Sequence, residues 1–483
     1  MSNPFVVIGG DAAGMSAASK AKRDAPDLNV VVFEKGSRIS YGACGLPYYV
    51  KGEIESLEEL ISVTPEEAIQ ERGIDLRLSY EVTAIDRSTK TVTAVSHENG
   101  ETVDQSYDDL LIATGARAVV PPVDGRDLTG VFTLHSLDDG RVLRAALESQ
   151  PDTDSHPVEE ISILEFLRTT DLERIGIIGG GVLGIELAEA FAANDLAVHL
   201  FQRGTHLLSP FGETVAREVE DHLREYSIEL YLEATVEQLV GENEQIVAVE
   251  TSGETVPVDM VVFATGVVPN VKIAADAGVE LGPTGAIRAD EYGRTNDEHI
   301  YAAGDCAEAI HIVTGDPVYA PLALTANRHG RAVGQTVTGT PTPVGQIAGT
   351  TAVKAFDLEI ARTGTITFED EARSAGFDPV SRVITAGSRS GYYPGGSPIT
   401  IELVGDRQSG RILGAGMVGS EGVAKRIDTV VTALSAEMTA TQVERLDLSY
   451  TPPISPVWDP VLIAARVLQT ELDTQLAEGN GGS

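Results

Sequence analysis

The sequence predicts an α/β protein with two Rossmann-like units and a C-terminal α+β domain. Two segments share one pattern: a short β-rich run, a glycine turn, a helix of small residues and a second β-rich run. They are residues 5–36, beginning FVVIGGDAAGM, and residues 174–204, beginning RIGIIGGGVLG. From about residue 345 onward, strands and amphipathic helices alternate without a glycine fingerprint. Each βαβ unit forms a right-handed parallel crossover, and two copies are far more specific than one.

The glycine turns of both units are expected to approach the pyrophosphates of bound dinucleotides. In the second unit Gly179 makes the tight turn, Gly181 admits the pyrophosphate and Gly184 allows close helix packing. Val182 and Leu183 follow in the same turn, where helix N-terminal amides face the phosphates.

In the first unit Gly9 and Gly14 fill the first and third of these roles, but Asp11 occupies the middle position. An acid is unfavourable beside a pyrophosphate, so we expect the Asp11 side chain to turn outward. A tight βα connection without a ligand is the alternative for either turn.

The ends of the second strands distinguish the two nucleotides. Glu34 lies 20 residues after Gly14, where a carboxylate binds ribose hydroxyls, and this predicts FAD in the first unit. The matching place in the second unit holds Gln202, followed by Arg203. An amide with a guanidinium suits a 2′-phosphate, which favours NADPH over NADH. A solvated strand-end charge is the alternative for Arg203.

Other strand ends complete the predicted nucleotide sites. The apolar strands at 110–116 and 261–270 contain ATG, another strand ends in Gly304-Asp305, and a helix is predicted over 321–335. An acid at the position of Asp305 can bind a ribityl hydroxyl of the flavin. The remaining predicted FAD-binding residues are Lys35, Val82, Thr114, Gly115 and Ala323, and Gly266 belongs to the NAD(P)H site.

These features predict a domain order. A discontinuous FAD-binding domain covers 1–146 and 276–340, and an acidic linker or insertion covers 147–172. An NAD(P)H-binding domain covers 173–275, a C-terminal dimerisation domain covers 345–470, and a disordered tail covers 471–483.

Charge and composition exclude several function classes. Lys+Arg 35 against Asp+Glu 73 gives a net charge of −38, which repels nucleic acid and anionic membranes. The sequence shows no signal peptide, long apolar run, disulfide framework or metal motif, so we expect a cytoplasmic protein. Only 8 of the 35 basic residues are lysines, and concentrated salt screens self-repulsion over about 3 Å. We therefore interpret the chain as halophilic, an interpretation that fails if it is equally stable and active at low and molar KCl. An ordinary acidic protein in which Arg has replaced Lys by genomic drift is the alternative.

A lone cysteine carries the redox prediction. Cys44 lies in SYGACGLPYYV (40–50), whereas Cys306 follows Asp305 and is expected to pack as a small apolar residue. The order of FAD unit, lone cysteine, NAD(P) unit, Gly-Asp motif and C-terminal domain resembles the pyridine nucleotide–disulfide oxidoreductases over nearly the whole chain. SYGACGLPYY is similar to their single-cysteine branch, which contains coenzyme A-disulfide reductases, NADH oxidases, NADH peroxidases and polysulfide reductases. The C-x₄-C pair of other members is absent, because the second position is Tyr49.

The resemblance implies that the substrate supplies the second sulfur. NADPH would pass a hydride to FAD, the reduced flavin would reduce a mixed disulfide between Cys44 and a thiol, and the freed Cys44 thiolate would attack a new disulfide. Pro47 fits the first turn of a helix, whose positive end would lower the thiol pKa. A buried, inert cysteine is the alternative.

The resemblance also implies residues that act on the substrate. SGYYPGGSP (390–398) and LSYTPPISP (448–456) match C-terminal motifs of coenzyme A-disulfide reductases, in which two tyrosines reach the active site of the other subunit of a homodimer. They correspond to Tyr392 and Tyr450, for which interface packing is the alternative. By position, the residues that resemble coenzyme A contacts are Ser16, Lys20, Arg23, Ser40 and Arg72. Trp458 stands where some members have a basic residue, so another small thiol or a persulfide remains open.

The predicted function is an FAD-dependent NAD(P)H reductase of coenzyme A disulfide or a similar low-molecular-weight disulfide. The alternatives are a hydrogen peroxide-forming NADH oxidase, a polysulfide or persulfide reductase, and a flavin redox sensor without turnover. Ala12 stands where peroxidases and water-forming oxidases of this branch carry a histidine, which argues against peroxide chemistry.

Overall fold

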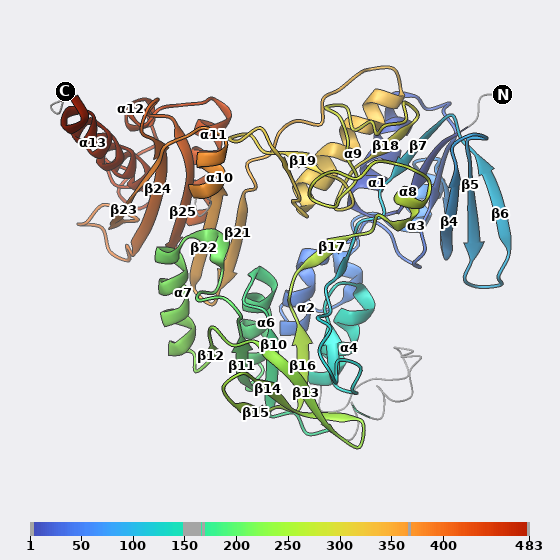
Figure 1. Cartoon of the computed structure of the whole chain (residues 1–483), viewed down its shortest axis with the longest axis horizontal. Helices are drawn as coiled ribbons and strands as arrows, with labels where there is room; N and C mark the ends of the chain where they lie inside the picture. The colour runs from blue at the N-terminus through green and yellow to red at the C-terminus, as the bar shows by residue number, and fades with distance from the viewer. Residues whose placement is uncertain (1–3, 148–165, 167–169, 366–368, 481–483) are drawn as a thin grey trace.

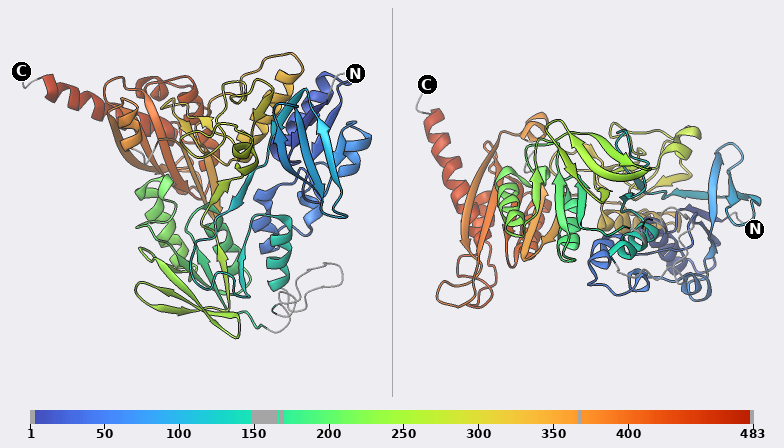
Figure 2. Two further views of the ribbon diagram at one scale, coloured as in Figure 1. Left: turned by 45° about the vertical axis from the view of Figure 1, so that its right-hand side comes forward. Right: turned by 90° about the horizontal axis from the view of Figure 1, so that it is seen from below.

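The structure is a computed structural model that describes residues 4–147, 166, 170–365 and 369–480. Two parallel sheets and one antiparallel sheet form three lobes (Figure 1). The first parallel sheet and the C-terminal sheet lie at opposite ends, and the second parallel sheet lies between and below them (Figures 1 and 2). Among the residues described, no helix has the length and apolar character needed to cross a bilayer.

The first parallel sheet has the strand order β18-β7-β1-β2-β3. Its strands are β1 (Phe5–Ile8), β2 (Val30–Phe33), β3 (Asp75–Arg77), β7 (Asp109–Ile112) and β18 (Ile300–Ala302). Strands β1, β2 and β18 are buried along their length, as expected of parallel strands covered on both faces. One face is covered by α1 (Ala12–Asp24) and α9 (Ala323–Val337). The other is covered by an antiparallel sheet of β4 (Tyr80–Asp86), β5 (Thr91–Ser96) and β6 (Thr102–Ser106).

Helices α1 and α9 cross closely because α9 carries two glycines at the crossing. A Cβ atom on Gly330 would lie 2.1 Å from the carbonyl oxygen of Ala13, and one on Gly334 would lie 2.5 Å from that of Ala17. These contacts bring the polar residues on both helices to one surface.

The second parallel sheet has the order β12-β11-β10-β16-β9. Its strands are β9 (Val131–Thr133), β10 (Arg174–Ile178), β11 (Ala197–Phe201), β12 (Glu229–Tyr231) and β16 (Met260–Phe263). Helices α6 (Val182–Ala192) and α7 (Glu213–Glu225) pack on one face, and β13 (Val236–Glu242), β14 (Gln245–Thr251) and β15 (Thr255–Pro257) belong to the layer on the other. Because β9 pairs with β16, the predicted boundary of the first domain at residue 146 does not match the sheet topology.

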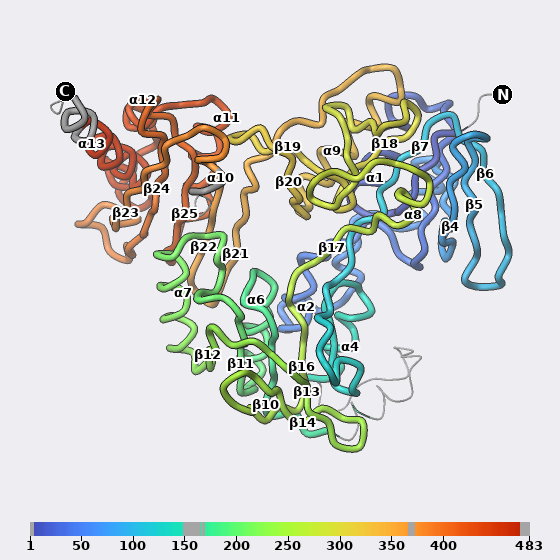
Figure 3. The backbone as a smooth tube through the Cα atoms, in the orientation of Figure 1, coloured from blue at the N-terminus to red at the C-terminus, as the bar shows by residue number. Residues whose placement is uncertain are grey.

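Two strands carry the chain between these sheets. Strand β8 (Ala116–Ala118) follows β7, β17 (Val267–Pro269) follows β16, and the two strands pair antiparallel. Figure 3 shows the chain leaving the first sheet along this ribbon and returning beside it. Both ATG sequences therefore end at the junction of the two lobes.

The C-terminal lobe is an antiparallel sheet of order β21-β22-β25-β24-β23. Its strands are β21 (Thr351–Ala355), β22 (Leu358–Gly364), β23 (Pro379–Gly387), β24 (Pro398–Asp406) and β25 (Ile412–Gly419). Its helices are α10 (Glu369–Ser374), α11 (Val423–Ser435), α12 (Ala440–Glu444) and α13 (Pro460–Asn480).

The disordered tail predicted from residue 471 is wrong as far as Asn480, because α13 continues to that residue. Leu468 and Leu472 are buried on one face of the helix and hold it against the sheet. Residues 481–483 and the first part of the predicted linker, 148–165, lie outside the described residues. Phe166, near the linker's end, is buried and lies against Phe132.

The remaining elements connect or flank these sheets. They are η1 (Ala43–Gly45), α2 (Leu46–Lys51), η2 (Leu57–Leu60), α3 (Pro65–Gln70), α4 (Leu137–Leu147), η3 (Ser209–Phe211), α8 (Lys272–Asp276), β19 (Ala309–Ile310) and β20 (Pro317–Val318).

Candidate active site

The first sheet gathers the predicted FAD-binding residues at one edge. Strands β1, β2, β7 and β18 are parallel and in register, so their carboxyl ends meet at the same edge. Gly9, Glu34, Thr114, Gly115 and Asp305 follow these strand ends.

The glycine turn after β1 accepts no side chain at its two predicted positions. Gly9 has φ +105°, and a Cβ there would lie 2.2 Å from the carbonyl oxygen of Ala113. A Cβ on Gly14 would lie 1.9 Å from the carbonyl oxygen of Gly9. The turn therefore brings bare backbone to the start of α1, as a pyrophosphate requires.

Glu34 braces this turn. Its two carboxylate oxygens accept hydrogen bonds from the amides of Gly10 and Gly36, each at 2.7 Å. An ionised carboxylate has about four acceptor positions, so two remain for ribose hydroxyls. Asp305 is half-buried, and burial raises the pKa of its carboxyl while His135 opposes the shift.

The other predicted FAD residues differ in their surroundings. The Thr114 hydroxyl donates to the Asn270 carbonyl at 2.7 Å, so Thr114 ties together the segments after β7 and β17. Ala323 begins α9, and Lys35 is exposed. The Val82 side chain is buried in the apolar core, which leaves its backbone as the group able to contact a nucleotide. Taken together, this edge fits FAD.

The expectation that Asp11 turns outward is wrong. Its carboxylate accepts a hydrogen bond from the Tyr41 amide at 3.1 Å, so the side chain bends towards the loop that carries Cys44. Burial raises the pKa of Asp11 to about 6, although the Tyr41 hydrogen bond opposes the shift. Asp11 thus connects the glycine turn to the cysteine loop.

The second glycine turn repeats the geometry of the first. Gly179 has φ +116°, and a Cβ there would lie 2.4 Å from the Ala264 carbonyl oxygen. A Cβ on Gly184 would lie 1.9 Å from the Gly179 carbonyl oxygen, whereas Gly181 and Gly266 face open space. Val182 and Leu183 open α6 and are partly buried. The open space at Gly181 is where a pyrophosphate would approach.

Gln202 occupies the place that Glu34 occupies in the first unit. Its side-chain oxygen accepts from the Gly180 amide at 3.2 Å, and its nitrogen donates to the His206 carbonyl at 3.1 Å. Arg203 is exposed beside it. Position 202 therefore offers an amide, and not a carboxylate, to a ribose hydroxyl.

Cys44 lies in η1, directly before α2, and Pro47 occupies the first turn of that helix as predicted. The residue is exposed, yet partial burial of the sulfur and the carboxylates of Glu186 and Asp305 raise the thiol pKa. The expected lowering of this pKa is wrong: burial and the carboxylates raise it, and α2, with only 6 residues, has a small partial charge at its end.

Helix α2 is fixed to α6 by two carboxylates that no motif in the sequence had indicated. The Tyr48 hydroxyl donates to Glu186 at 3.2 Å, and burial raises the pKa of Glu186 to about 7. Lys51 pairs with the buried Glu189 at 2.6 Å, and Glu189 also accepts from the Phe356 amide at 2.9 Å.

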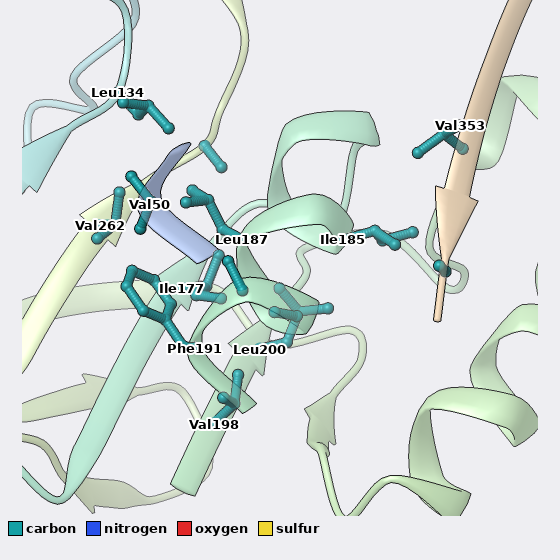
Figure 4. Close-up of a cluster of buried hydrophobic side chains, with 14 of the residues drawn as sticks. Val50, Leu134, Ile177, Ile185, Leu187, Phe191, Val198, Leu200, Val262 and Val353 are labelled. Carbon is teal, nitrogen blue, oxygen red and sulfur yellow. The ribbon is translucent and has the colours of Figure 1, made fainter. Parts of the chain in front are cut away.

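An apolar cluster supports these polar contacts (Figure 4). Val50 of α2 meets Leu187 and Phe191 of α6, and Val353 of β21 lies on the far side of that helix. The helix after Cys44 thus contacts the second parallel sheet's lobe, while α6 reaches the C-terminal lobe.

All five predicted substrate contacts line one cavity of about 370 Å³. Helix α1 contributes Ser16, Lys20 and Arg23, the cysteine loop contributes Ser40, and Arg72 lies after α3. Ser40 lies four residues before Cys44, so the cavity borders the cysteine loop.

Helix α9 adds Asn327, Arg328 and Arg331 to this cavity, three residues that no motif in the sequence had indicated. The Ser16 hydroxyl donates to Asn327 at 2.6 Å across the helix crossing. Lys20 pairs with Asp24 at 2.5 Å, and Arg72 donates to Ser19 at 2.7 Å. In a chain of net charge −38, this concentration of cations suits an anionic ligand.

Tyr392 and Tyr450 come together in the C-terminal lobe. Their hydroxyl oxygens lie 3.1 Å apart, and the side chains are exposed. Tyr392 belongs to the loop between β23 and β24, which lies on the outer side of its sheet, away from α2 (Figures 1 and 2). The structure therefore unites the two tyrosines with each other but not with Cys44 of the same chain.

Two further residues that the sequence singled out have defined surroundings. Cys306 is fully buried, and its sulfur contacts the carbonyl oxygens of Ile112 and Ala303, each at 3.4 Å. Trp458 is half exposed, and the Arg466 guanidinium lies 4.1 Å from its ring centroid. Within the described residues, no three or more His, Cys, Asp or Glu side chains are arranged to hold a metal ion.

Comparison with known families accounts for nearly the whole chain. Residues 3–330 match the family described as pyridine nucleotide-disulphide oxidoreductase, and residues 350–460 match its dimerisation domain.

Curated relatives extend this likeness. An "NAD(P)H coenzyme A polysulfide/persulfide reductase" of Pyrococcus horikoshii is 37% identical over 470 residues, covering 97% of this chain and 99% of the relative. A "Coenzyme A disulfide reductase" of Staphylococcus aureus is 28% identical over 452 residues, covering 93% and 96%.

A solved structure described as "reduced Bacillus anthracis CoADR-RHD" superimposes with a TM-score of 0.90 at 32% identity, covering 98% of this chain and 81% of the other. An "NAD-Dependent Persulfide Reductase from A. fulgidus" gives 0.89 at 36% identity, covering 98% and 84%.

Proposed function

The chain belongs to the pyridine nucleotide-disulphide oxidoreductase family, and from this we propose that it reduces a low-molecular-weight disulfide, in the first place coenzyme A disulfide, through Cys44. The observation that carries the proposal is the cation-lined cavity beside the cysteine loop. A phosphorylated carrier would bind there while its sulfur reaches Cys44.

FAD would be held at the edge of the first sheet and, when bound, would deliver two electrons from NAD(P)H to sulfur. The residues of the chain would bind and orient the two nucleotides. Glu34 and Asp305 would bind the ribose and ribityl hydroxyls, and Gly9 and Gly14 would keep the path of the phosphates free of side chains. Gln202 and Arg203 would choose the electron donor.

The sulfur chemistry balances around one cysteine. Two electrons and a proton convert the mixed disulfide Cys44–S–S–R into the Cys44 thiolate and RSH. That thiolate attacks RSSR, re-forms Cys44–S–S–R and releases RS⁻, which takes up a proton. A mixed disulfide at rest suits this site, because burial and the carboxylates of Glu186 and Asp305 disfavour a free thiolate.

We further propose a homodimer in which the tyrosine pair of one chain serves the Cys44 of the other. The match to a dimerisation domain supports association of two chains. Near the tyrosines, Ile454, Val457 and Trp458 are 67%, 62% and 50% exposed, which is typical of an apolar surface that a partner covers. The phenol hydroxyls would then donate to the departing thiolate.

A coenzyme A persulfide is the second candidate substrate. Relatives named for coenzyme A-dependent polysulfide, persulfide or sulfur reduction are 37% and 38% identical to this chain. The same cavity would hold the carrier, and the Cys44 thiolate would attack the sulfur bound to it. This step would break the S–S bond of the persulfide, form the mixed disulfide between Cys44 and coenzyme A, and release hydrosulfide.

The test is the mass of protein purified without reductant. An adduct on Cys44 equal to coenzyme A minus two hydrogens supports the proposal, and reductant should release coenzyme A. An adduct of another thiol would redirect the substrate assignment. Unmodified Cys44, together with no disulfide-dependent oxidation of NADPH under anaerobic conditions, would overturn the proposal.

A further inference from the structure

A largely buried arginine connects the two tyrosine-bearing segments. Arg426 of α11 is 11% exposed at its side chain and pairs with Asp459 at 2.8 Å. Its second nitrogen donates to the carbonyl oxygens of Ser388 at 3.0 Å and Ile454 at 3.4 Å. Ser388 lies four residues before Tyr392, and Ile454 lies four residues after Tyr450. One guanidinium therefore connects both segments.

Further buried polar groups join the same framework. The Ser390 amide donates to the Pro452 carbonyl at 3.2 Å, which links the two segments directly. The Ser455 hydroxyl donates to Asp459 at 3.0 Å. Ser390, Ser455 and Asp459 are only 5%, 3% and 7% exposed. Their hydrogen bonds therefore belong to the interior of the C-terminal lobe and not to its surface.

A second ion pair fixes the Tyr392 loop from its other side. Arg389 makes a bidentate pair with Glu421, at 2.8 and 2.5 Å, and donates to the Pro394 carbonyl at 3.3 Å. The Ser388 hydroxyl also donates to Glu421 and accepts from the Ser397 amide at 3.0 Å. The loop is thus held at both ends and in its middle.

Such a network adds little to the free energy of unfolding, but it determines the relative positions of the groups that it connects. Removing two charges from water offsets much of their attraction, so a buried ion pair adds little net stability. A fully connected network does impose one arrangement, and a guanidinium offers five donors in a rigid plane. The tyrosines themselves are 75% and 47% exposed and have little packing to hold them.

We propose that Arg426 is a positioning residue for disulfide reduction, which sets the two segments so that the Tyr392 and Tyr450 hydroxyls act together on the leaving thiolate. The inference rests on the proposed function and deepens it, because it explains how two exposed phenols keep one geometry. A displacement of about 1 Å lowers a rate by up to about 100-fold. A looser framework should therefore slow the reduction of the disulfide.

The experiment is a mutant cycle on the holoenzyme, with the two half-reactions followed by stopped-flow absorbance of the flavin. Arg426→Lys keeps the charge that pairs with Asp459 but cannot reach three acceptors. We expect it to slow reoxidation by coenzyme A disulfide about 10-fold to 100-fold, without changing flavin reduction by NADPH. In the Tyr392→Phe, Tyr450→Phe background the same substitution should change reoxidation less than about 2-fold.

Arg407→Lys is the matched control. Arg407 pairs with Asp378 at 2.9 Å at the far end of the same strands, away from the tyrosines, and should leave reoxidation unchanged. Overturning results are equal slowing by Arg407→Lys, or full slowing by Arg426→Lys when both tyrosines are already phenylalanine. The second outcome would mean that Arg426 acts independently of the hydroxyls.

Amide hydrogen exchange separates this inference from the proposed function. Arg426→Lys should accelerate exchange in 389–397 and 450–457 together, whatever the substrate. Ser455→Ala, a milder change to the same network, should do so to a smaller extent and serves if Arg426→Lys fails to fold. Normal exchange in either segment overturns the positioning role. Wild-type protein without disulfide turnover, but with these exchange effects, would instead overturn the proposed function.

Discussion

The hydroxyl oxygens of Tyr392 and Tyr450 lie 3.1 Å apart, although 58 positions separate the two residues in the chain. The hydrogen bond with Tyr392 raises the pKa of Tyr450, so the phenol keeps its proton. A protonated phenol can donate to a departing thiolate. Helix α2, directly after Cys44, and the loop after β23, which carries Tyr392, lie far apart in one chain (Figure 1), so the proposed shared site requires a second chain.

Mixing two variants tests the shared site. Cys44→Ser in one chain and Tyr392→Phe with Tyr450→Phe in the other should give heterodimers with one intact site and one doubly damaged site. Disulfide reductase activity should recover to about a quarter of wild type if exchange is random, by the statistics of a two-fold assembly. Exchange is verified by native mass spectrometry of differently tagged chains. Verified heterodimers without recovery would leave the tyrosines as interface packing.

Cys44→Ser should abolish disulfide reduction and leave flavin reduction by NADPH intact. Serine preserves the volume, but its hydroxyl does not form a thiolate or a mixed disulfide. Slow oxygen reduction should persist. Cys306→Ser is the matched control, since Cys306 is buried in the core, and should retain disulfide turnover. Turnover by Cys44→Ser at the wild-type rate would remove Cys44 from the mechanism.

The cations that line the cavity should bind the phosphates of coenzyme A. Arg331→Ala and Arg23→Ala should each raise KM for coenzyme A disulfide about 10-fold, the value of one charge-assisted hydrogen bond. Pantethine, a disulfide that lacks the nucleotide phosphates, should show little change. Arg217→Ala, which removes an exposed ion pair on α7, is the control. Equal effects on both disulfides would show that the arginines shape the site without binding phosphate.

Arg203→Ala should raise KM for NADPH about 10-fold and leave KM for NADH nearly unchanged, because only NADPH carries the 2′-phosphate that a guanidinium would pair with. Steady-state kinetics with each donor at saturating disulfide measures this. If both donors are affected equally, Arg203 does not distinguish them. Arg224→Ala, an exposed arginine on α7 that pairs with Asp221, is the control.

The pH dependence of Cys44 alkylation should reflect its carboxylate neighbours. Burial and Glu186 raise the thiol pKa, so iodoacetamide labelling should increase with pH and have its midpoint above the ordinary thiol value. Glu186→Gln removes a negative charge that opposes the thiolate, and should move the midpoint to lower pH. Glu53 is the exposed partner of Lys51, and Glu53→Gln should leave the midpoint of labelling unchanged. An unmoved midpoint in Glu186→Gln would remove that carboxylate from the thiol's surroundings.

Much of the nucleotide-binding architecture could be predicted from short stretches of sequence. At Gly9, Gly14, Gly179 and Gly184 the reason is local: the backbone passes so close to itself that a side chain would collide. Such a constraint involves a strand and the helix after it, so it leaves a visible pattern. The parallel strands also read as continuous apolar runs because they are buried on both faces.

Sequence patterns failed where distant segments decide the outcome. Asp11 turned towards the Tyr41 amide, 30 residues away, and not outward. The thiol pKa of Cys44 was predicted from its own helix, whereas the carboxylate of Glu186 reaches it from the second lobe. Strand β9 pairs with β16 and therefore belongs to the second sheet. A strand of three residues carries too little pattern for this pairing to be predicted from the sequence.

The sequence alone determined which residues we expect to carry the chemistry: a lone cysteine, two glycine turns and two tyrosine motifs, all recognisable within about ten neighbouring positions. Only the tertiary structure decided which of them meet. Ser16 and Asn327 stand 311 positions apart yet share a hydrogen bond, because two helices cross where glycines remove the side chains between them. Arg328 and Arg331 lie on one of these helices, α9, and Arg426 of α11 finds its partners in Ser388, Ile454 and Asp459, all at least 28 positions away. A local backbone constraint involves adjacent residues, so it leaves a recognisable pattern in the sequence. A pocket or a buried ion pair depends instead on how separate elements pack, and the energy of that packing is spread over the whole chain.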